Sequence, residues 1–226
     1  MNHLLLETER FRFIDWGRRE YQSSVQAMKE HVEERRQNQG KDTIFFVEHD
    51  PVITMGRRGR KEHLVGPRDP DGSAIAGIPV VVSDRGGDVT LHSPGQLVIY
   101  PVIALTAREQ HLHDLLKAYE ELIIRCSIEY SINAFRIHGK TGVWTERGKL
   151  ASIGIHLERW IAYHGIALNV SNDLTLFDHI IPCGLMGIKM TSLELEAGRT
   201  IDISMVKGQI LKLFPNVWED FRERAM

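Results

Sequence analysis

Apolar and polar positions alternate along several short segments in the first part of the chain, and one longer segment carries a helical pattern. Residues 10–14 alternate polar and apolar side chains and predict a strand. Residues 17–38 are rich in Glu, Gln, Arg and Ala and predict a helix that ends near Gly40. Residues 43–47 form an apolar run typical of a buried strand, and residues 52–55 predict a second short strand.

The rest of the chain predicts more strands than helices. A loop rich in Gly, Pro and charge is expected over residues 56–77, and turns are expected at 84–87 and 93–95. The remaining strands are predicted at 78–82, 89–92, 97–102, 142–145, 149–157 and 160–169. Two further helices are predicted over about 111–132 and 203–213.

Strands that follow one another in hairpin-like succession predict an α+β fold. A doubly wound parallel sheet would need regular alternation of strands and helices, which the pattern lacks. We therefore expect a mixed, largely antiparallel sheet with flanking helices. The chain is long enough to bury a sizeable core, and we expect one domain over residues 1–226, with residues 198–226 as a small C-terminal helical region.

The composition and charge of the chain argue against some classes of binding partner. The chain has 226 residues and a formal net charge of −2, which argues against nucleic acid as the main partner. No apolar run reaches the roughly 18 residues of a membrane span, and the N-terminus becomes charged at Glu7, too early for a secretory signal. We expect a cytoplasmic protein that binds neither nucleic acid nor membrane. One local run, Arg57-Arg58-Gly59-Arg60-Lys61, is strongly basic.

The two cysteines differ in their surroundings. Cys183 lies in Ile181-Pro182-Cys183-Gly184, where Pro and Gly disfavour regular structure and favour a loop that another molecule can approach. A buried cysteine that packs like a small apolar side chain is the alternative. Cys126 lies among apolar residues at helical spacing and is expected in the core. Their separation fits neither a CxxC redox motif nor a zinc finger, so no metal is expected.

Three further segments carry candidate chemistry. Gly86 and Gly87 allow a tight turn against which a ligand can lie, although an ordinary hairpin with a Gly-Gly turn is the favoured interpretation of this segment alone. Lys149 opens a strand after a turn, where a lysine is usually a solvated charge. Small residues at Gly154, Gly165 and Ala167 leave room for a slender apolar ligand. No GxxxxGK[ST] phosphate loop is present.

Taken together, these segments resemble a known family. The motifs are Arg85-Gly86-Gly87-x-x-Thr90-x-His92-x-Pro94-Gly95-Gln96, Gly142-Val143-Trp144, Lys149-Leu150-Ala151-Ser152-Ile153-Gly154, His164-Gly165-x-Ala167-Leu168-Asn169-Val170 and Pro182-Cys183-Gly184. In this order they resemble the lipoyl(octanoyl) transferases, the LipB family. Ser93 is a departure, because the family more usually has Gly there. The resemblance implies a fold shared with biotin protein ligases and lipoate ligases.

The resemblance also implies a reaction. Such enzymes move an octanoyl group from acyl carrier protein to a lysine of a lipoyl domain, either in 2-oxoacid dehydrogenase subunits or in the glycine cleavage H protein. The cysteine matching Cys183 is acylated, the lysine matching Lys149 pairs with it, and no cofactor is implied. The residues implied to line the acyl site are Arg85, Gly86, Gly87, Asp88, Val89, Thr90, Leu91, His92, Ser152, Ile153, Gly154, Gly165, Ile166 and Ala167. His164 is a further candidate.

The chemistry of a thiol beside an amine agrees with this expectation. Attack on a thioester needs a thiolate, and a free cysteine with a pKa of about 8.5 is only a few per cent ionised at neutral pH. A lysine ammonium nearby would favour the thiolate and could then act as acid and base in both half-reactions. Two other functions remain open. One is an ATP-dependent lipoate ligase, which would need no cysteine nucleophile, and the other is a non-catalytic module that binds carrier proteins.

Overall fold

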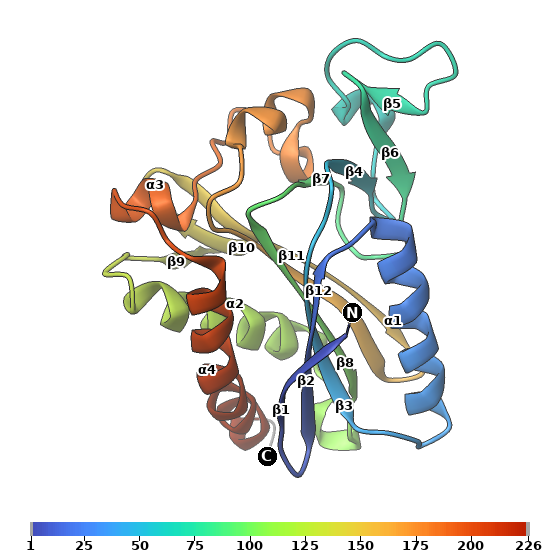
Figure 1. The fold of residues 1–226 in the computed structure, drawn as a ribbon, viewed down its shortest axis with the longest axis vertical. Coiled ribbons are helices and arrows are strands. Elements are labelled where there is room, and N and C mark those ends of the chain that lie inside the picture. The colour runs from blue at the N-terminus through green and yellow to red at the C-terminus, as the bar shows by residue number, and fades with distance from the viewer. Residues whose placement is uncertain (1, 225–226) are drawn as a thin grey trace.

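A large mixed sheet forms the centre of the computed structural model, which describes residues 2–224 (Figure 1). Within these residues the sheet has eight strands, and only the β2–β3 pair is parallel. In spatial order the strands are β1 (His3–Glu7), β2 (Phe11–Arg18), β3 (Asp42–Glu48), β8 (Gln96–Ala104), β12 (Ile161–Asn169), β11 (Gly148–Glu158), β10 (Lys140–Thr145) and β9 (Phe135–Ile137). The expected α+β fold with a mixed, largely antiparallel sheet is confirmed.

A smaller sheet packs at one end of the large one (Figure 1). In the described residues it has four strands in the order β5 (Ala74–Ile75), β6 (Ile78–Val82), β4 (Val52–Met55) and β7 (Val89–His92). Strand β7 pairs antiparallel with β4 and also packs against the short 3-10 turn η4 (Pro182–Gly184). The small sheet therefore brings the Gly-rich turn before β7 close to the cysteine loop.

Helices cover both faces of the large sheet (Figure 1). Helix α1 (Tyr21–Arg36) packs on one face, and α2 (Leu112–Ile128) packs with α4 (Ile203–Arg224) on the other. The side chains of β3 show why both faces need cover. Ile44 and Phe46 join the core under α2 and α4, whereas Phe45 and Val47 join the core under α1.

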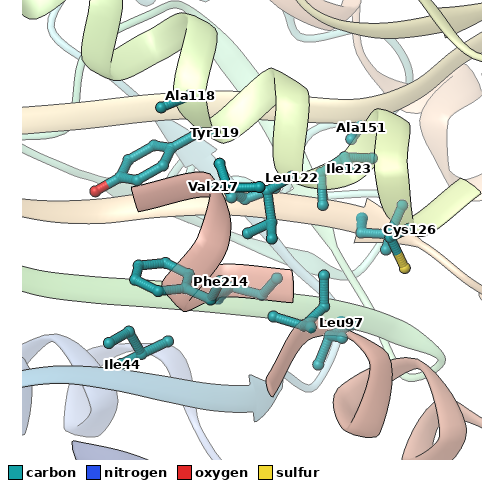
Figure 2. Close-up of a cluster of buried hydrophobic side chains, with 14 of the residues drawn as sticks. Ile44, Leu97, Ala118, Tyr119, Leu122, Ile123, Cys126, Ala151, Phe214 and Val217 are labelled. Carbon is teal, nitrogen blue, oxygen red and sulfur yellow. The ribbon is translucent and has the colours of Figure 1, made fainter. Parts of the chain in front are cut away.

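Figure 2 shows the core between α2, α4 and the sheet, where Cys126 lies with Leu122, Ile123 and Phe214. Burial raises the pKa of the Cys126 thiol to about 12. The expectation that this cysteine belongs to the core is confirmed. The remaining short elements are η1 (Lys61–His63), η2 (Ala107–Glu109), η3 (Leu174–His179) and α3 (Leu193–Ala197).

Several predicted boundaries are wrong. The first helix begins at Tyr21 and not at residue 17, because β2 continues to Arg18 and Glu20 caps the helix by accepting hydrogen bonds from the Gln22 and Ser23 amides. The last helix continues past Pro215 to Arg224, because buried side chains at Val217, Trp218 and Phe221 keep it on the core. The C-terminal region from residue 198 thus packs into the main core as far as it is described, and residues 225–226 lie outside the described part.

Strands β1, β5 and β9 and helix α3 were not predicted, and β5 lies within the loop expected over residues 56–77. Each is short, and every residue of β1 is exposed, so none shows a strong periodic pattern. Trp160, at the start of the strand predicted over residues 160–169, is exposed because it lies in the tight turn between β11 and β12. No helix within residues 2–224 is long and apolar enough to cross a membrane.

Candidate active site

A cavity of about 480 Å³ opens where the large sheet, the small sheet and the η4 turn meet. Its volume lies within the range of about 300 to 1,000 Å³ that is typical of small-molecule sites. Both Cys183 and Lys149 lie on its wall. The other expected residues on the wall are Arg85, Gly87, Asp88, Val89, Thr90, His92, Ser152, Ile153, Gly154, His164, Gly165, Ile166 and Ala167.

Gly86 and Leu91 do not reach the cavity wall. Leu91 points to the opposite side of β7 from Thr90 and His92 and packs in the small-sheet core with Ile53. Gly86 lies against β11, where its amide donates to the Ile155 carbonyl at 2.9 Å. Neither residue lines the cavity, and both lie behind its wall.

Cys183 and Lys149 come together from distant parts of the chain. The Nζ atom of Lys149 lies 2.9 Å from the Sγ atom of Cys183. The lysine side chain is 1% exposed, which excludes the solvated surface charge that is usual for a lysine beside a turn. The buried amine and the thiol are therefore direct hydrogen-bond partners on the cavity wall.

The backbone around Lys149 is fixed on two sides. Its amide donates to the Lys189 carbonyl at 2.8 Å, and its carbonyl accepts from the Thr191 amide at 3.0 Å. The ammonium also lies 5.2 Å from the centre of the Trp144 ring, within the range of a cation–π contact. A Cβ atom at Gly142 would come within 2.7 Å of the Lys149 Cε atom. The Gly142-Val143-Trp144 motif therefore makes the room in which the lysine lies.

The turn that carries Cys183 holds it in a strained conformation. The Gly184 amide donates to the Ile181 carbonyl at 3.0 Å and closes a turn with Pro182 in the second position. Cys183 has φ 58° and ψ 17°, a left-handed conformation that costs a residue with a side chain about 1–2 kcal/mol. Strain of this kind is common at functional sites, because surrounding contacts must hold the residue in place.

His63 and Asp88 both contact this turn. The sequence analysis named Asp88 as an acyl-site residue but did not name His63. His63 Nδ1 lies 2.9 Å from Asp88 Oδ1, and the His63 carbonyl accepts from the Ile181 amide at 2.7 Å. A Cβ atom at Gly184 would come within 2.7 Å of Asp88 Oδ2 and 2.8 Å of His63 Cε1. The His63–Asp88 pair thus packs directly on Gly184, the residue after Cys183. His63 is the last residue of η1, within the segment expected as a loop, and no periodic signal marks it.

Arg85 is buried in the wall with neutral partners. Its guanidinium donates to Thr54 Oγ1 and to the Gly86 carbonyl, and no carboxylate forms a salt bridge with it among the described residues. Burial lowers the pKa of this guanidinium, which still remains charged at neutral pH. The cavity therefore contains a second buried positive charge besides Lys149.

Neutral histidines form the part of the wall next to Arg85. Burial lowers the pKa of His92 well below its ordinary value, and its Nδ1 atom donates to Gln96 Oε1 at 2.7 Å. Burial also lowers the pKa of His164, whose Nε2 atom donates to Asp84 Oδ1 at 2.7 Å. That hydrogen bond helps to hold the pKa of Asp84 well below its usual range.

Gly154 in β11 and Gly165 in β12 are required by close backbone contacts as well as by the room that a ligand would need. A Cβ atom at Gly154 would meet the Gly86 carbonyl at 2.7 Å, and one at Gly165 would overlap the Ile99 carbonyl. Both glycines are thus required by neighbouring backbone and not only by a ligand.

Comparison with known proteins agrees with this geometry. Residues 20–215 match the family described as the lipoyl protein ligase A/B catalytic domain. An octanoyltransferase from Geobacter metallireducens is 40% identical over 201 residues, which is 89% of this chain and 90% of that protein. An octanoyltransferase from Syntrophotalea carbinolica is 44% identical over 176 residues, which is 78% of this chain and 79% of that protein. The chain belongs to the octanoyltransferase family.

Membership in the octanoyltransferase family confirms the expected resemblance and the expected enzyme class, an acyltransferase. Solved structures agree at the level of the fold. A putative lipoate protein ligase from T. acidophilum with bound lipoic acid has a TM-score of 0.73 at 14% identity, over 96% of this chain and 92% of that one. A biotin protein ligase from Aquifex aeolicus has a TM-score of 0.52 at 13% identity, over 96% and 72%. The fold expected from the resemblance is therefore confirmed.

Proposed function

We propose that this octanoyltransferase carries the octanoyl group on Cys183 as a thioester. The octanoyl group would come from acyl carrier protein and pass to a specific lysine of lipoyl domains in 2-oxoacid dehydrogenases and in the glycine cleavage H protein. The observation that carries the proposal is the 2.9 Å contact between Lys149 Nζ and Cys183 Sγ on the cavity wall. A buried pair of this kind has the parts that acyl transfer through cysteine needs.

In the first half-reaction the Cys183 thiolate attacks the carbonyl carbon of the donor thioester. The intermediate collapses by expelling the donor thiolate, which takes a proton from the Lys149 ammonium. In the second half-reaction the acceptor amine attacks the Cys183 thioester, and Lys149 accepts the proton that the amine loses. Cys183 leaves as the thiolate beside the restored ammonium, so one lysine serves both steps.

The two competing functions fit the site less well. A ligase that adenylates a free acid has no use for a cysteine nucleophile, whereas here the thiol contacts the buried ammonium directly. A non-catalytic binding module would leave Cys183 buried and Lys149 solvated. The structure has the reverse arrangement, with Cys183 partly exposed on the cavity wall and Lys149 buried.

The cavity offers apolar contacts to an acyl tail. Its apolar side chains are Val89, Val98, Ile153, Ile166, Ala167 and Leu185. Burial of about six methylene groups would contribute about 5 kcal/mol at roughly 0.8 kcal/mol each. Burial of this size would hold an octanoyl tail in the cavity during transfer.

The rim of the cavity favours acidic partners. The wall includes Arg58, Arg60 and Lys140, and within residues 2–224 none of the three forms a salt bridge. The Arg58 amide donates to the Gly87 carbonyl at 3.0 Å, which places the basic run beside the Gly-rich turn. Acyl carrier proteins and lipoyl domains are generally acidic, and exposed charges mainly speed the association of partners.

The basic rim can be tested with two charge reversals. Arg58→Glu combined with Arg60→Glu should raise KM for octanoyl acyl carrier protein and weaken its dependence on salt, while turnover of a small octanoyl thioester stays unchanged. Unchanged kinetics with the carrier protein would remove these residues from the docking surface. Equal losses with both donors would point to misfolding.

Mass spectrometry of the intact protein tests the thioester. After incubation with octanoyl acyl carrier protein, the wild-type chain should gain one octanoyl group that hydroxylamine removes. Cys183→Ala should abolish both the adduct and transfer, whereas Cys126→Ala should keep both, because Cys126 is buried with a pKa raised to about 12. Full transfer by Cys183→Ala would overturn the mechanism.

A further inference from the structure

Attack on a thioester produces a negatively charged oxygen, and the Cys183 turn supplies few donors for it. The Gly184 amide is already bound to the Ile181 carbonyl at 3.0 Å, and the Leu185 amide to the Pro182 carbonyl at 3.1 Å. In the described part of the chain, the Cys183 amide has no hydrogen-bond acceptor. The two amides that follow the nucleophile are therefore occupied, and the site needs another donor beside the Cys183 amide.

Strand β7 lies next to this turn and carries one unused donor. Thr90 is 6% exposed, and its side chain shares a cavity wall with Cys183. Seven buried side-chain polar atoms within residues 2–224 have no hydrogen-bond partner, and Thr90 Oγ1 is the one among them that belongs to a cavity residue. A buried hydroxyl without a partner costs about 1–3 kcal/mol, so a ligand atom is the natural partner for it.

Neighbouring polar groups cannot take this role, because they are already paired. His92 donates to Gln96, and the Thr54 hydroxyl accepts from Arg85 and lies 3.4 Å from His92 Nε2. Thr54 stands opposite Thr90 in the β4–β7 ladder, but Arg85 holds it away from any ligand. Thr90 is thus the β7 side chain with a proton free for a substrate.

We propose that the Thr90 hydroxyl and the Cys183 amide bind the oxyanion of the tetrahedral intermediate. The proposal rests on the proposed thioester mechanism and assigns Thr90 a catalytic role. As the thiolate forms its bond to the carbonyl carbon, the carbonyl electron pair moves to oxygen, and Thr90 donates a hydrogen bond to that oxygen. When the donor thiolate leaves with the proton from Lys149, the carbonyl re-forms. Thr90 keeps its own proton throughout.

Thr90→Val tests this role because valine has nearly the same shape and lacks the hydroxyl. Removal of one such donor costs about 100-fold in rate in comparable sites, so we expect acylation of Cys183 by a small octanoyl thioester to slow about 100-fold with little change in KM. Thr90→Ser should recover at least about tenfold of that loss. Thr43→Val, which changes a buried strand threonine outside the cavity, should keep wild-type activity.

Alkylation by iodoacetamide separates an oxyanion role from a positioning role. Alkylation displaces iodide from a saturated carbon and forms no oxyanion, so Thr90→Val should alkylate at Cys183 within about twofold of the wild-type rate. Its Tm should equal or exceed that of the wild type, since the variant removes an unpaired buried hydroxyl.

Three results would overturn the proposal. They are acylation of Thr90→Val within about threefold of wild type, parallel losses of acylation and alkylation, or a rise in KM with kcat unchanged. A wild-type chain that forms no octanoyl adduct would overturn the thioester mechanism as well. That outcome is distinct, because it does not depend on Thr90.

Discussion

Replacement of Lys149 by methionine is the most direct test of the buried pair. Methionine has a similar length and no charge, so Lys149→Met removes the ammonium 2.9 Å from Cys183 Sγ while filling the same space. The lysine is 1% exposed, and loss of its charge leaves a neutral thiol and no stranded ion. Since buried charges are costly to desolvate, the variant should unfold at a Tm no lower than that of the wild type.

The expected loss of activity has two parts. The Lys149 ammonium donates a hydrogen bond to the Cys183 sulfur, and a hydrogen bond to a charged group is worth about 1.5–3 kcal/mol, so its loss should slow attack by Cys183 by about 10- to 150-fold. Loss of the proton donor and acceptor adds a factor of about 100 or more. Octanoyl transfer should therefore fall by at least about 1,000-fold, whereas alkylation of Cys183 by iodoacetamide, which needs only the thiolate, should fall by the first factor alone.

The assay compares the two rates in the same protein. Single-turnover acylation followed by mass spectrometry gives the first, and iodoacetamide labelling at pH 7 gives the second. Lys149→Arg keeps a positive charge but cannot release its proton at neutral pH, and it should lose about 100-fold or more in transfer. Near-normal transfer in either variant would refute the assignment of acid and base to Lys149.

Two further predictions follow from the contacts of the site. Gly184→Ala should lower transfer strongly, because the added Cβ atom would press on Asp88 and His63. Gly187 has a similar positive φ with open space around it, so Gly187→Ala should keep activity. Equal losses of transfer in the two variants would assign the effect to backbone strain alone. Burial lowers the pKa of His49 to about 4, below the value of about 6.5 in the unfolded chain. Between about pH 4 and about pH 6.5 the unfolded chain therefore binds more protons than the folded chain, and the unfolding free energy falls as the pH falls. This residue alone should cost about 2 kcal/mol of unfolding free energy between pH 7 and pH 5, and urea unfolding of His49→Gln should show a pH dependence smaller by that amount; an unchanged dependence would contradict the assignment.

Periodic patterns predicted the sheet and the long helices because those elements bury a regular face. The strand over residues 43–47 and the helix begun near residue 111 were found close to their expected places. The N-terminal edge strand β1 was missed because all of its side chains are exposed, so no apolar alternation marks it. The last helix was predicted to end near residue 213, but packing of Trp218 and Phe221 on the core outweighs the hydrogen bond lost at Pro215.

The cavity residues could be expected from the sequence only where motifs carried them. Cys183 and Lys149 were placed together by the family resemblance, since no spacing rule relates residues 34 positions apart in a turn and a strand. The contact of His63 with the η4 turn could not be predicted from the sequence, because it depends on how two distant segments approach each other in the fold. The sequence also does not show that the Gly184 and Leu185 amides are occupied by backbone hydrogen bonds. These bonds leave the two amides unable to bind an oxyanion, so other groups must do so.

The conformation of Cys183 connects the fold to the chemistry. A glycine at this position would adopt φ 58° without strain, so the cysteine costs the fold about 1–2 kcal/mol, and the proposed thioester mechanism supplies a reason for this cost. The turn keeps this conformation because Pro182 and Gly184 shape the backbone, and because His63 and Asp88 pack on Gly184. The thiol is thereby held against an ammonium that belongs to a rigid strand of the large sheet. In the proposed mechanism, relaxation of the turn would relieve this strain but move the thiol away from the ammonium, and Cys183 would lose its proton donor.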